Sequence, residues 1–338
     1  MNVYRSSGDL GDCVFSLAAV KHLGTGTYVL VDRPWTAVLT RRAHLIEPLL
    51  RSQSYIYDVK VGDGHGLEVT HDFSTFRNGG LPWGRSLAAL HAEWIGVPAG
   101  TLDFTKPWIC IDPTPGLEKK VILARSPRYN TAFFPWKQIV EFLGKDALFV
   151  GLEMEHVRFC EAFGEVEYLP TRNLLELAGV ISGSHSMVAN QSSPNSLAEA
   201  LKHRRILEVA PHVPDCCIGG GDVQYSCDGA VTIIRPSDGE VLSVPAWVPP
   251  REVNLDVTPP GLFQFKLPNG DVLSGITYGQ IRQIARQQFQ YHGLPFPADF
   301  EQQLIKQTGD RLPGYGVPRW FESQRELFSK IKQLTNKQ

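Results

Sequence analysis

Near the start of the chain, a polar segment follows a short apolar run. Arg5-Ser6-Ser7-Gly8-Asp9-Leu10-Gly11-Asp12 comes after a strand candidate at residues 2–5 and before a stretch with helical periodicity. Ligands of open α/β sheets bind at the carboxyl ends of strands, and two glycines allow a tight turn there. Asp12 is expected at or near the helix start, where backbone amides and the helix dipole stabilise a carboxylate. The alternative is that Asp12 is only a helix N-cap.

A second polar segment, Asn190-Gln191-Ser192-Ser193-Pro194-Asn195-Ser196, separates another apolar strand pattern from a helical one. Ser192 or Ser193 suits the N-cap position, and Pro194 suits the first helical turn. The amides around residues 193–196 would then point at a ligand above the strand. A diphosphate binds well at such a helix N-terminus, although a polar cap before a helix is also ordinary.

Two further segments follow apolar strand candidates. Arg125 and Arg128 could clamp phosphate oxygens, or they could be a pair of surface arginines. Glu155, which follows Gly151 by four residues, could accept hydrogen bonds from ribose hydroxyls. The alternative for Glu155 is an acid in the first turn of a helix.

Strand and helix patterns alternate along most of the chain, and this alternation predicts parallel sheets with right-handed crossovers. A stretch rich in Pro and Gly at residues 99–119 separates two such series. The expected fold is α/β, with two Rossmann-like domains facing a cleft and a small, mainly helical C-terminal module. The expected domains are residues 1–110, residues 111–240, and residues 241–338. The last domain is expected to hold a Pro-rich tether, a hairpin over residues 263–273, and helices at 278–291, 298–307 and 321–334.

Composition narrows the class of protein. Of the 338 residues, 43% are hydrophobic and 20% are charged, so the chain is globular rather than disordered. No apolar run reaches the roughly 18–20 residues of a membrane span, and the N-terminus lacks the pattern of a secretion signal. Six scattered cysteines indicate reduced thiols and a cytoplasmic location. His212, Cys216, Cys217 and Cys227 lack the spacing of a structural zinc site, and no metal is expected.

The net charge of −2 gives no overall field that would attract nucleic acid. Residues 251–338 contain 11 Lys and Arg against 8 Asp and Glu, a local charge of +3. A polymeric anion such as DNA is therefore a possible partner for that module.

The order of these motifs resembles the heptosyltransferase-type GT-B glycosyltransferases of family 9. The opening Gly8–Leu17 is similar to the Gly-Asp start of that family, and Gly151 with Glu155 is similar to its nucleotide-side turn. Leu174–Ile181 is similar to one of its helices, and Val188–Leu201 lies where the family has an Asp-Ser/Thr-Gly-x-x-His-Leu-Ala motif. The resemblance covers about residues 1–235.

The resemblance implies a nucleotide-diphosphate sugar held by the second half and a hydroxyl acceptor, such as a glycan, held by the first. Transfer would invert the anomeric centre without an essential metal or a further cofactor. Asp12 would be the general base. Glu155 would bind the ribose. The leaving diphosphate would be stabilised by the remaining candidates, which are Gly11, Arg125, Arg128, Gln191, Ser192, Ser193 and Ser196.

This sequence departs from the family motif at three positions. Gln191, Ser193 and Ser196 stand where the family has Asp, Gly and His. A smaller hydroxyl thus replaces a histidine that contacts phosphate. A catalytically inactive binding or scaffold protein with the same fold is the alternative hypothesis.

Overall fold

The structure is a computed structural model. It describes residues 1–33, 39–62, 66–76, 86–131, 134–210, 219–226, 229–245, 264–266, 272–274, 282, 285–286, 289–290, 295–298 and 300.

The first half of the chain forms a four-stranded parallel sheet in the order β3-β2-β1-β4. Its strands are β1 (Asn2–Ser6), β2 (Gly26–Leu30), β3 (Ile56–Val61) and β4 (His71–Asp72). Its helices are α1 (Leu10–Leu23), α2 (Ala43–Arg51) and α3 (Leu87–Trp94), with short 3₁₀ turns at Thr40–Arg42 and Ala99–Thr101. Strand order changes direction between β1 and β4, and ligands of open α/β sheets bind at such switch points.

The second half forms a six-stranded parallel sheet in the order β10-β9-β8-β5-β6-β7. Its strands are β5 (Val121–Ala124), β6 (Ala147–Phe149), β7 (Glu167–Tyr168), β8 (Ser186–Asn190), β9 (Arg205–Glu208) and β10 (Val223–Ser226). Its helices are α4 (Trp136–Leu143), α5 (Glu153–Phe163), α6 (Leu174–Gly183) and α7 (Ser193–Leu201), with a 3₁₀ turn at Gly144–Asp146. This order is that of the dinucleotide-binding fold, and its switch point lies between β5 and β8.

The parallel sheets predicted from the alternation of elements are confirmed. Three strands were not expected from the sequence: β10, and the antiparallel hairpin of β11 (Val231–Ile234) and β12 (Val241–Val244). The hairpin packs against the apolar core of the second sheet through Leu242 and Val244. The expected domain boundary after residue 240 therefore falls inside this hairpin.

The C-terminal hairpin expected over residues 263–273 is present as β13 (Gln264–Lys266) and β14 (Val272–Ser274), which pair antiparallel. The Pro-rich tether and the three helices expected after it lie mostly outside the described residues. His212, Cys216, Cys217 and Cys227 lie outside them as well.

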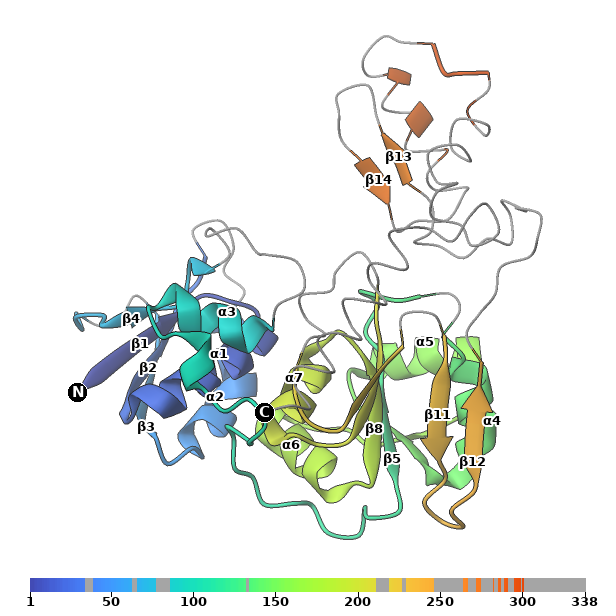
Figure 1. Cartoon of the computed structure of the whole chain (residues 1–338), viewed down its shortest axis with the longest axis horizontal. Helices are drawn as coiled ribbons and strands as arrows, with labels where there is room; N and C mark the ends of the chain where they lie inside the picture. The colour runs from blue at the N-terminus through green and yellow to red at the C-terminus, as the bar shows by residue number, and fades with distance from the viewer. Residues whose placement is uncertain are drawn as a thin grey trace.

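One hydrophobic core runs through both sheets. It contains Leu17 of α1 and Ile46 of α2 together with Leu177 of α6 and Leu197 of α7, all buried. Helix α1 packs against α7, and α2 packs against α6, so the two halves meet through helices rather than through a flexible link alone (Figure 1). Burial of apolar area across this contact favours a fixed arrangement of the two sheets.

Trp108, in the segment between the two sheets, joins α1 to α7. Its indole N–H donates to the carbonyl of Val14 in α1 at 3.0 Å, and its backbone N–H donates to the carbonyl of Ala200 in α7 at 3.0 Å. The ammonium group of Lys202 lies 4.5 Å from the ring centroid, within the range of a cation–π contact. The ring is buried, so these contacts hold both helices at one point.

None of the helices within the described ranges is both long enough and apolar enough to cross a lipid bilayer.

We predict that Trp108→Ala lowers the free energy of unfolding by about 3–5 kcal/mol, because it empties a core site shared by both halves. Trp108→Phe should cost about 1–3 kcal/mol, because the Val14 carbonyl loses a buried donor. Urea unfolding followed by circular dichroism measures both. Trp94→Phe, at a residue that is 38% exposed, is the control. An unchanged midpoint for Trp108→Ala would show that Trp108 does not join the halves.

We also predict a pH dependence of stability from His203. Burial, with a smaller contribution from the charge of Arg205, lowers the pKa of His203 from 6.5 to about 4. The unfolded chain gains the proton near pH 6.5, whereas the folded chain resists it until about pH 4. Stability is therefore full above pH 6.5 and falls by at most about 3 kcal/mol as the pH drops to 4.

His203→Gln should reduce the dependence of the free energy of unfolding on pH. It keeps a polar group beside Ser184 Oγ, which lies 3.1 Å from His203 Nε2. The urea midpoint measured across this pH range tests it, with exposed His22→Gln as the control. Equal slopes for the wild type and His203→Gln would exclude His203 as the source.

Candidate functional site

The loops at the two switch points meet. A Cβ on Gly11, near the start of α1, would lie 3.4 Å from Ser196 Oγ in α7. Arg128 Nη1, from the loop after β5, lies 4.0 Å from Asp9 Oδ2 at the start of α1. We call this region, formed by residues 7–12, 125–131 and 190–196, the junction. The structure thus brings three of the four segments predicted from the sequence together.

Asp12 is the third residue of α1, and Asp9 rather than Asp12 occupies the N-cap position. The N-cap interpretation of Asp12 is therefore wrong, whereas its expected place at the helix start is confirmed. Asp12 Oδ2 accepts from the Asp9 backbone N–H at 3.0 Å and lies 3.5 Å from Arg33 Nη2. Arg33 Nε donates to the Ser7 carbonyl at 3.0 Å, which ties this cation to the loop after β1. The carboxylate is nearly buried, with 4% of its side chain exposed.

Gly8 is required by the position of Asp12. A Cβ on Gly8 would lie 2.5 Å from Asp12 Cβ and 2.9 Å from Asp12 Oδ2. No side chain fits at that distance, and Asp12 Cβ cannot rotate away. The glycine therefore lets the loop pass directly over the carboxylate.

The start of α7 presents the second polar segment. Ser192 is the N-cap, and Pro194 lies in the first turn, as predicted. The Asn195 and Ser196 backbone N–H groups donate to the Ser192 carbonyl at 3.0 and 3.4 Å, and Ser196 Oγ donates to the Ser193 carbonyl at 2.6 Å. Pro194 has no N–H and adds no donor to this turn, whereas the positive end of the helix dipole favours an anion there.

Gln191 and Asn190 hold loops in place. Gln191 is buried, and its Oε1 accepts from the Ala210 backbone N–H at 2.6 Å. Asn190 Oδ1 accepts from the Ser126 backbone N–H at 3.2 Å, while Asn190 Nδ2 donates to the Arg128 carbonyl at 2.5 Å. Both amides therefore link the end of β8 to neighbouring loops at the switch point.

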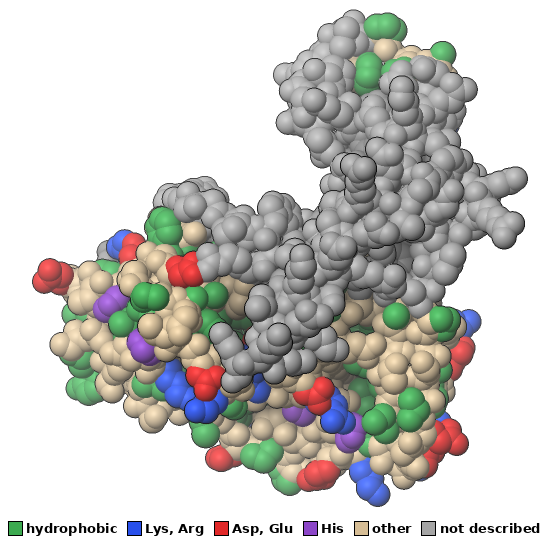
Figure 2. All heavy atoms as spheres, viewed as in Figure 1, with side chains coloured by type: hydrophobic (Ala, Val, Ile, Leu, Met, Phe, Trp, Pro, Cys, Tyr) green, Lys and Arg blue, Asp and Glu red, His purple; other side chains and the backbone are tan. Residues whose placement is uncertain are grey.

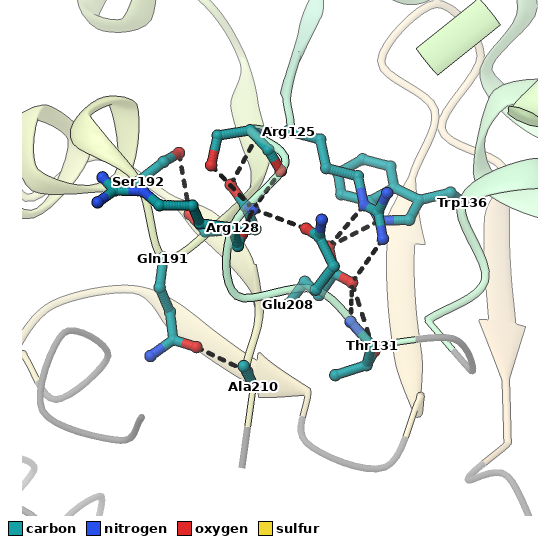
Figure 3. Close-up of polar contacts among 11 residues, drawn as sticks. Arg125, Arg128, Thr131, Trp136, Gln191, Ser192, Glu208 and Ala210 are labelled. Atoms are coloured by element: carbon teal, nitrogen blue, oxygen red, sulfur yellow. Dashed lines mark hydrogen bonds and ion pairs between the residues drawn. The ribbon is translucent and has the colours of Figure 1, made fainter. Parts of the chain in front are cut away.

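Glu208, the last residue of β9, was not predicted as a site residue. It is fully buried and accepts hydrogen bonds from Arg125 Nε at 3.0 Å and Arg125 Nη2 at 3.3 Å. It also accepts from the Thr131 backbone N–H at 2.6 Å and from Trp136 Nε1 at 2.9 Å (Figure 3). The only signal in the sequence is an acid at the end of the apolar strand Arg205–Glu208, which carries no information about its partners.

Glu155 lies apart from the junction loops, in the first turn of α5 after β6. Its Oε2 accepts from the Leu152 backbone N–H at 3.0 Å, which is an ordinary helix-start contact. In the order of the second sheet, β6 is the neighbour of β5 on the side away from β8. Dinucleotide-binding folds carry their ribose-binding acid after the strand at this place. Its ribose role stays a prediction.

Charge does not gather strongly on the face seen in Figure 2, where acidic and basic side chains of the described residues lie interspersed. Among the described residues, no group of three or more His, Cys, Asp and Glu side chains is arranged to hold a metal ion.

Neither a protein-family model nor a curated protein sequence matches this chain. Several solved structures are similar to it. A glycosyl transferase of family 9 from Veillonella parvula DSM 2008 has 11% sequence identity and a TM-score of 0.47, covering 67% of this chain and 86% of that one. The E. coli heptosyltransferase WaaC, solved with ADP-2-deoxy-2-fluoro heptose, has 15% identity and a TM-score of 0.38, covering 67% and 93%.

The dodecameric iron-containing heptosyltransferase TibC, solved with ADP-D-beta-D-heptose, has 11% identity and a TM-score of 0.42, covering 67% of this chain and 63% of that one. These proteins are of the kind that the motif order resembles. With TM-scores under 0.5, none of them assigns a role to a residue of this chain.

We predict that Gly8→Ala lowers the free energy of unfolding by about 1–3 kcal/mol, because the new methyl group must displace Asp12 or the loop. Gly100→Ala, where a Cβ would meet no atom within 4 Å, should change stability by less than about 0.5 kcal/mol. Urea unfolding measures both.

In an Asp12→Gly background the cost of Gly8→Ala should largely disappear, since the colliding Cβ is gone. An equal cost in both backgrounds would show that the two residues do not constrain each other.

Proposed function

We propose that this chain is a GT-B-type glycosyltransferase that moves a sugar from a nucleotide-diphosphate sugar to a hydroxyl group of an acceptor. The observation that supports this proposal is the meeting of two switch points, one from each parallel sheet, at the junction. Two features carry that observation: a Cβ on Gly11 would lie 3.4 Å from Ser196 Oγ, and Asp9 forms an ion pair with Arg128. An activated donor bound to one sheet would then lie next to an acceptor bound to the other.

The second sheet is the proposed donor side. The nucleotide would lie over the switch point between β5 and β8, with its diphosphate at the start of α7 near Ser192 and Ser193. Arg128, with 58% of its side chain exposed, would pair with the diphosphate oxygens. Glu155 would accept from the ribose hydroxyls.

The first sheet is the proposed acceptor side, with Asp12 as the general base. An acceptor hydroxyl attacks the anomeric carbon while the Asp12 carboxylate takes its proton. The new glycosidic C–O bond forms as the bond from the anomeric carbon to the diphosphate oxygen breaks. The electron pair of the broken bond leaves on the diphosphate, where Arg128 and the α7 dipole stabilise it. A single displacement of this kind inverts the anomeric centre and assigns no step to a metal ion.

We predict that Asp12→Asn lowers the transfer rate by about 10²–10⁴-fold, the usual contribution of a general base. The amide oxygen of asparagine can still accept from the Asp9 N–H, so the fold and the nucleotide affinity should change little. The assay supplies a mixture of glycans as acceptors and ADP-, GDP- or UDP-sugars as donors. The transfer rate is measured from the nucleoside diphosphate that is released. Asp112→Asn, at an exposed position between the two sheets, is the control.

A retained full rate in Asp12→Asn would remove Asp12 from the role of base. Donor binding is measured separately by thermal shift, because a ligand at about 100 times its Kd adds about 2.7 kcal/mol of stability. No shift with any nucleotide sugar would favour the alternative of a scaffold protein.

A further inference from the structure

The two arginines after β5 differ sharply in their surroundings. Arg125 has 18% of its side chain exposed, contacts Glu208 through two nitrogens, and lies 5.0 Å from the ring centroid of Phe163. Arg128 is 58% exposed and lies 4.0 Å from Asp9 of the other half. Pulling Arg125 toward a phosphate would leave the Glu208 carboxylate buried without its cation, which costs several kcal/mol. Arg125 is therefore an anchor, and Arg128 is the cation that a ligand can reach.

Glu208 holds both ends of the segment that carries Arg128. We call residues 125–131 the arginine loop. Arg125 at its start and Thr131 at its end both donate to Glu208, and Trp136 at the start of α4 donates to the same carboxylate. A carboxylate has about four acceptor positions, and the five hydrogen bonds that these three residues donate occupy all of them.

Asn190 holds the middle of the arginine loop. Its Nδ2 has three acceptors within hydrogen-bond distance, which are the carbonyls of Ser126 and Arg128 and Asn130 Oδ1, at 3.0, 2.5 and 2.8 Å. Tyr129, between these residues, has a φ of 57°, a conformation that a non-glycine residue rarely adopts unless its surroundings impose it. The loop is therefore held in one conformation by buried contacts from β8 and β9.

We propose that Glu208 is a positioning residue that fixes both ends of the arginine loop, so that Arg128 faces Asp9 across the junction. This proposal rests on the proposed function in one respect, because Arg128 is taken as the contact for the donor diphosphate. Glu208 itself touches no substrate in this scheme.

The first experiment tests the loop without any ligand. Glu208→Gln keeps one acceptor oxygen but replaces the other with an NH₂ group. The donors that bind the second oxygen in the wild type would then face another donor. Amide hydrogen exchange, followed by mass spectrometry, should speed up about tenfold or more over residues 126–131. The control is Asp146→Asn, another buried carboxylate, which accepts from the Ser237 N–H on a different loop. Unchanged exchange in the arginine loop of Glu208→Gln would overturn the proposal.

The second experiment tests the link to Arg128. The Kd values of ADP, GDP and UDP are measured by calorimetry for the wild type, Glu208→Gln, Arg128→Gln and the double variant. Each single variant should raise the Kd of the nucleotide that binds most tightly to the wild type by about tenfold or more, the size of a charge-assisted contact. The double variant should be no weaker than Arg128→Gln, because Glu208 acts through the loop that carries Arg128. If Glu208→Gln acted by a general weakening of the fold, its loss of nucleotide affinity would add to that of Arg128→Gln. Additive losses of affinity in the double variant would therefore overturn the proposal.

Two outcomes separate this proposal from the proposed function. If the wild type binds none of the three nucleotides, the proposed donor site fails, and the exchange experiment still decides whether Glu208 holds the loop. If Glu208→Gln does not fold, Glu208→Gln with Arg125→Met removes both charges and leaves none unpaired. That variant should fold and show the same faster exchange over residues 126–131, and protection equal to the wild type would overturn the proposal.

Discussion

The packing of α1 against α7 is the constraint on which the junction depends. Each sheet alone would carry a switch point at its carboxyl edge, but two edges make one site only if they are held facing each other. The shared apolar core and the two hydrogen bonds of Trp108 supply that restraint. Because α1 starts at the loop of one switch point and α7 starts at the other, the packing of these two helices also brings the loops of the junction together.

Most of the fold could be predicted from the sequence because its signals are local. Apolar runs separated by turn residues mark parallel strands, and helical periodicity between them marks the crossovers. The strands that were missed are β10, β11 and β12. In β11 buried and exposed residues alternate, and the four residues of each of these strands give too short a pattern to stand out. β10 is placed by pairing with β9, and the hairpin of β11 and β12 is placed by packing against the apolar core of the second sheet, so both depend on tertiary contacts.

The site could be predicted only in part, and for a related reason. The places of Asp12 and Ser192 at the starts of helices could be predicted, because the start of a helix after a strand is visible in local sequence. Glu208 was not found, because its partner Arg125 lies 83 positions earlier in the chain and no spacing rule connects them. Only the order of the sheet, which places β9 two strands from β5, brings the pair together.

The buried pair of Glu208 and Arg125 explains why two arginines three positions apart take different roles. A buried ion pair adds little net stability over apolar residues of similar size, so its presence calls for a benefit of another kind. Here the carboxylate joins Arg125 to Thr131 and Trp136, so one buried charge fixes the course of a whole loop. A long side chain such as Arg128 loses about 2 kcal/mol of rotamer entropy when it is ordered by a ligand, and a mobile backbone would add to that loss. Fixing the backbone in advance confines the cost to the side chain, which is how Glu208, whose side chain is fully buried, can influence what binds at the junction.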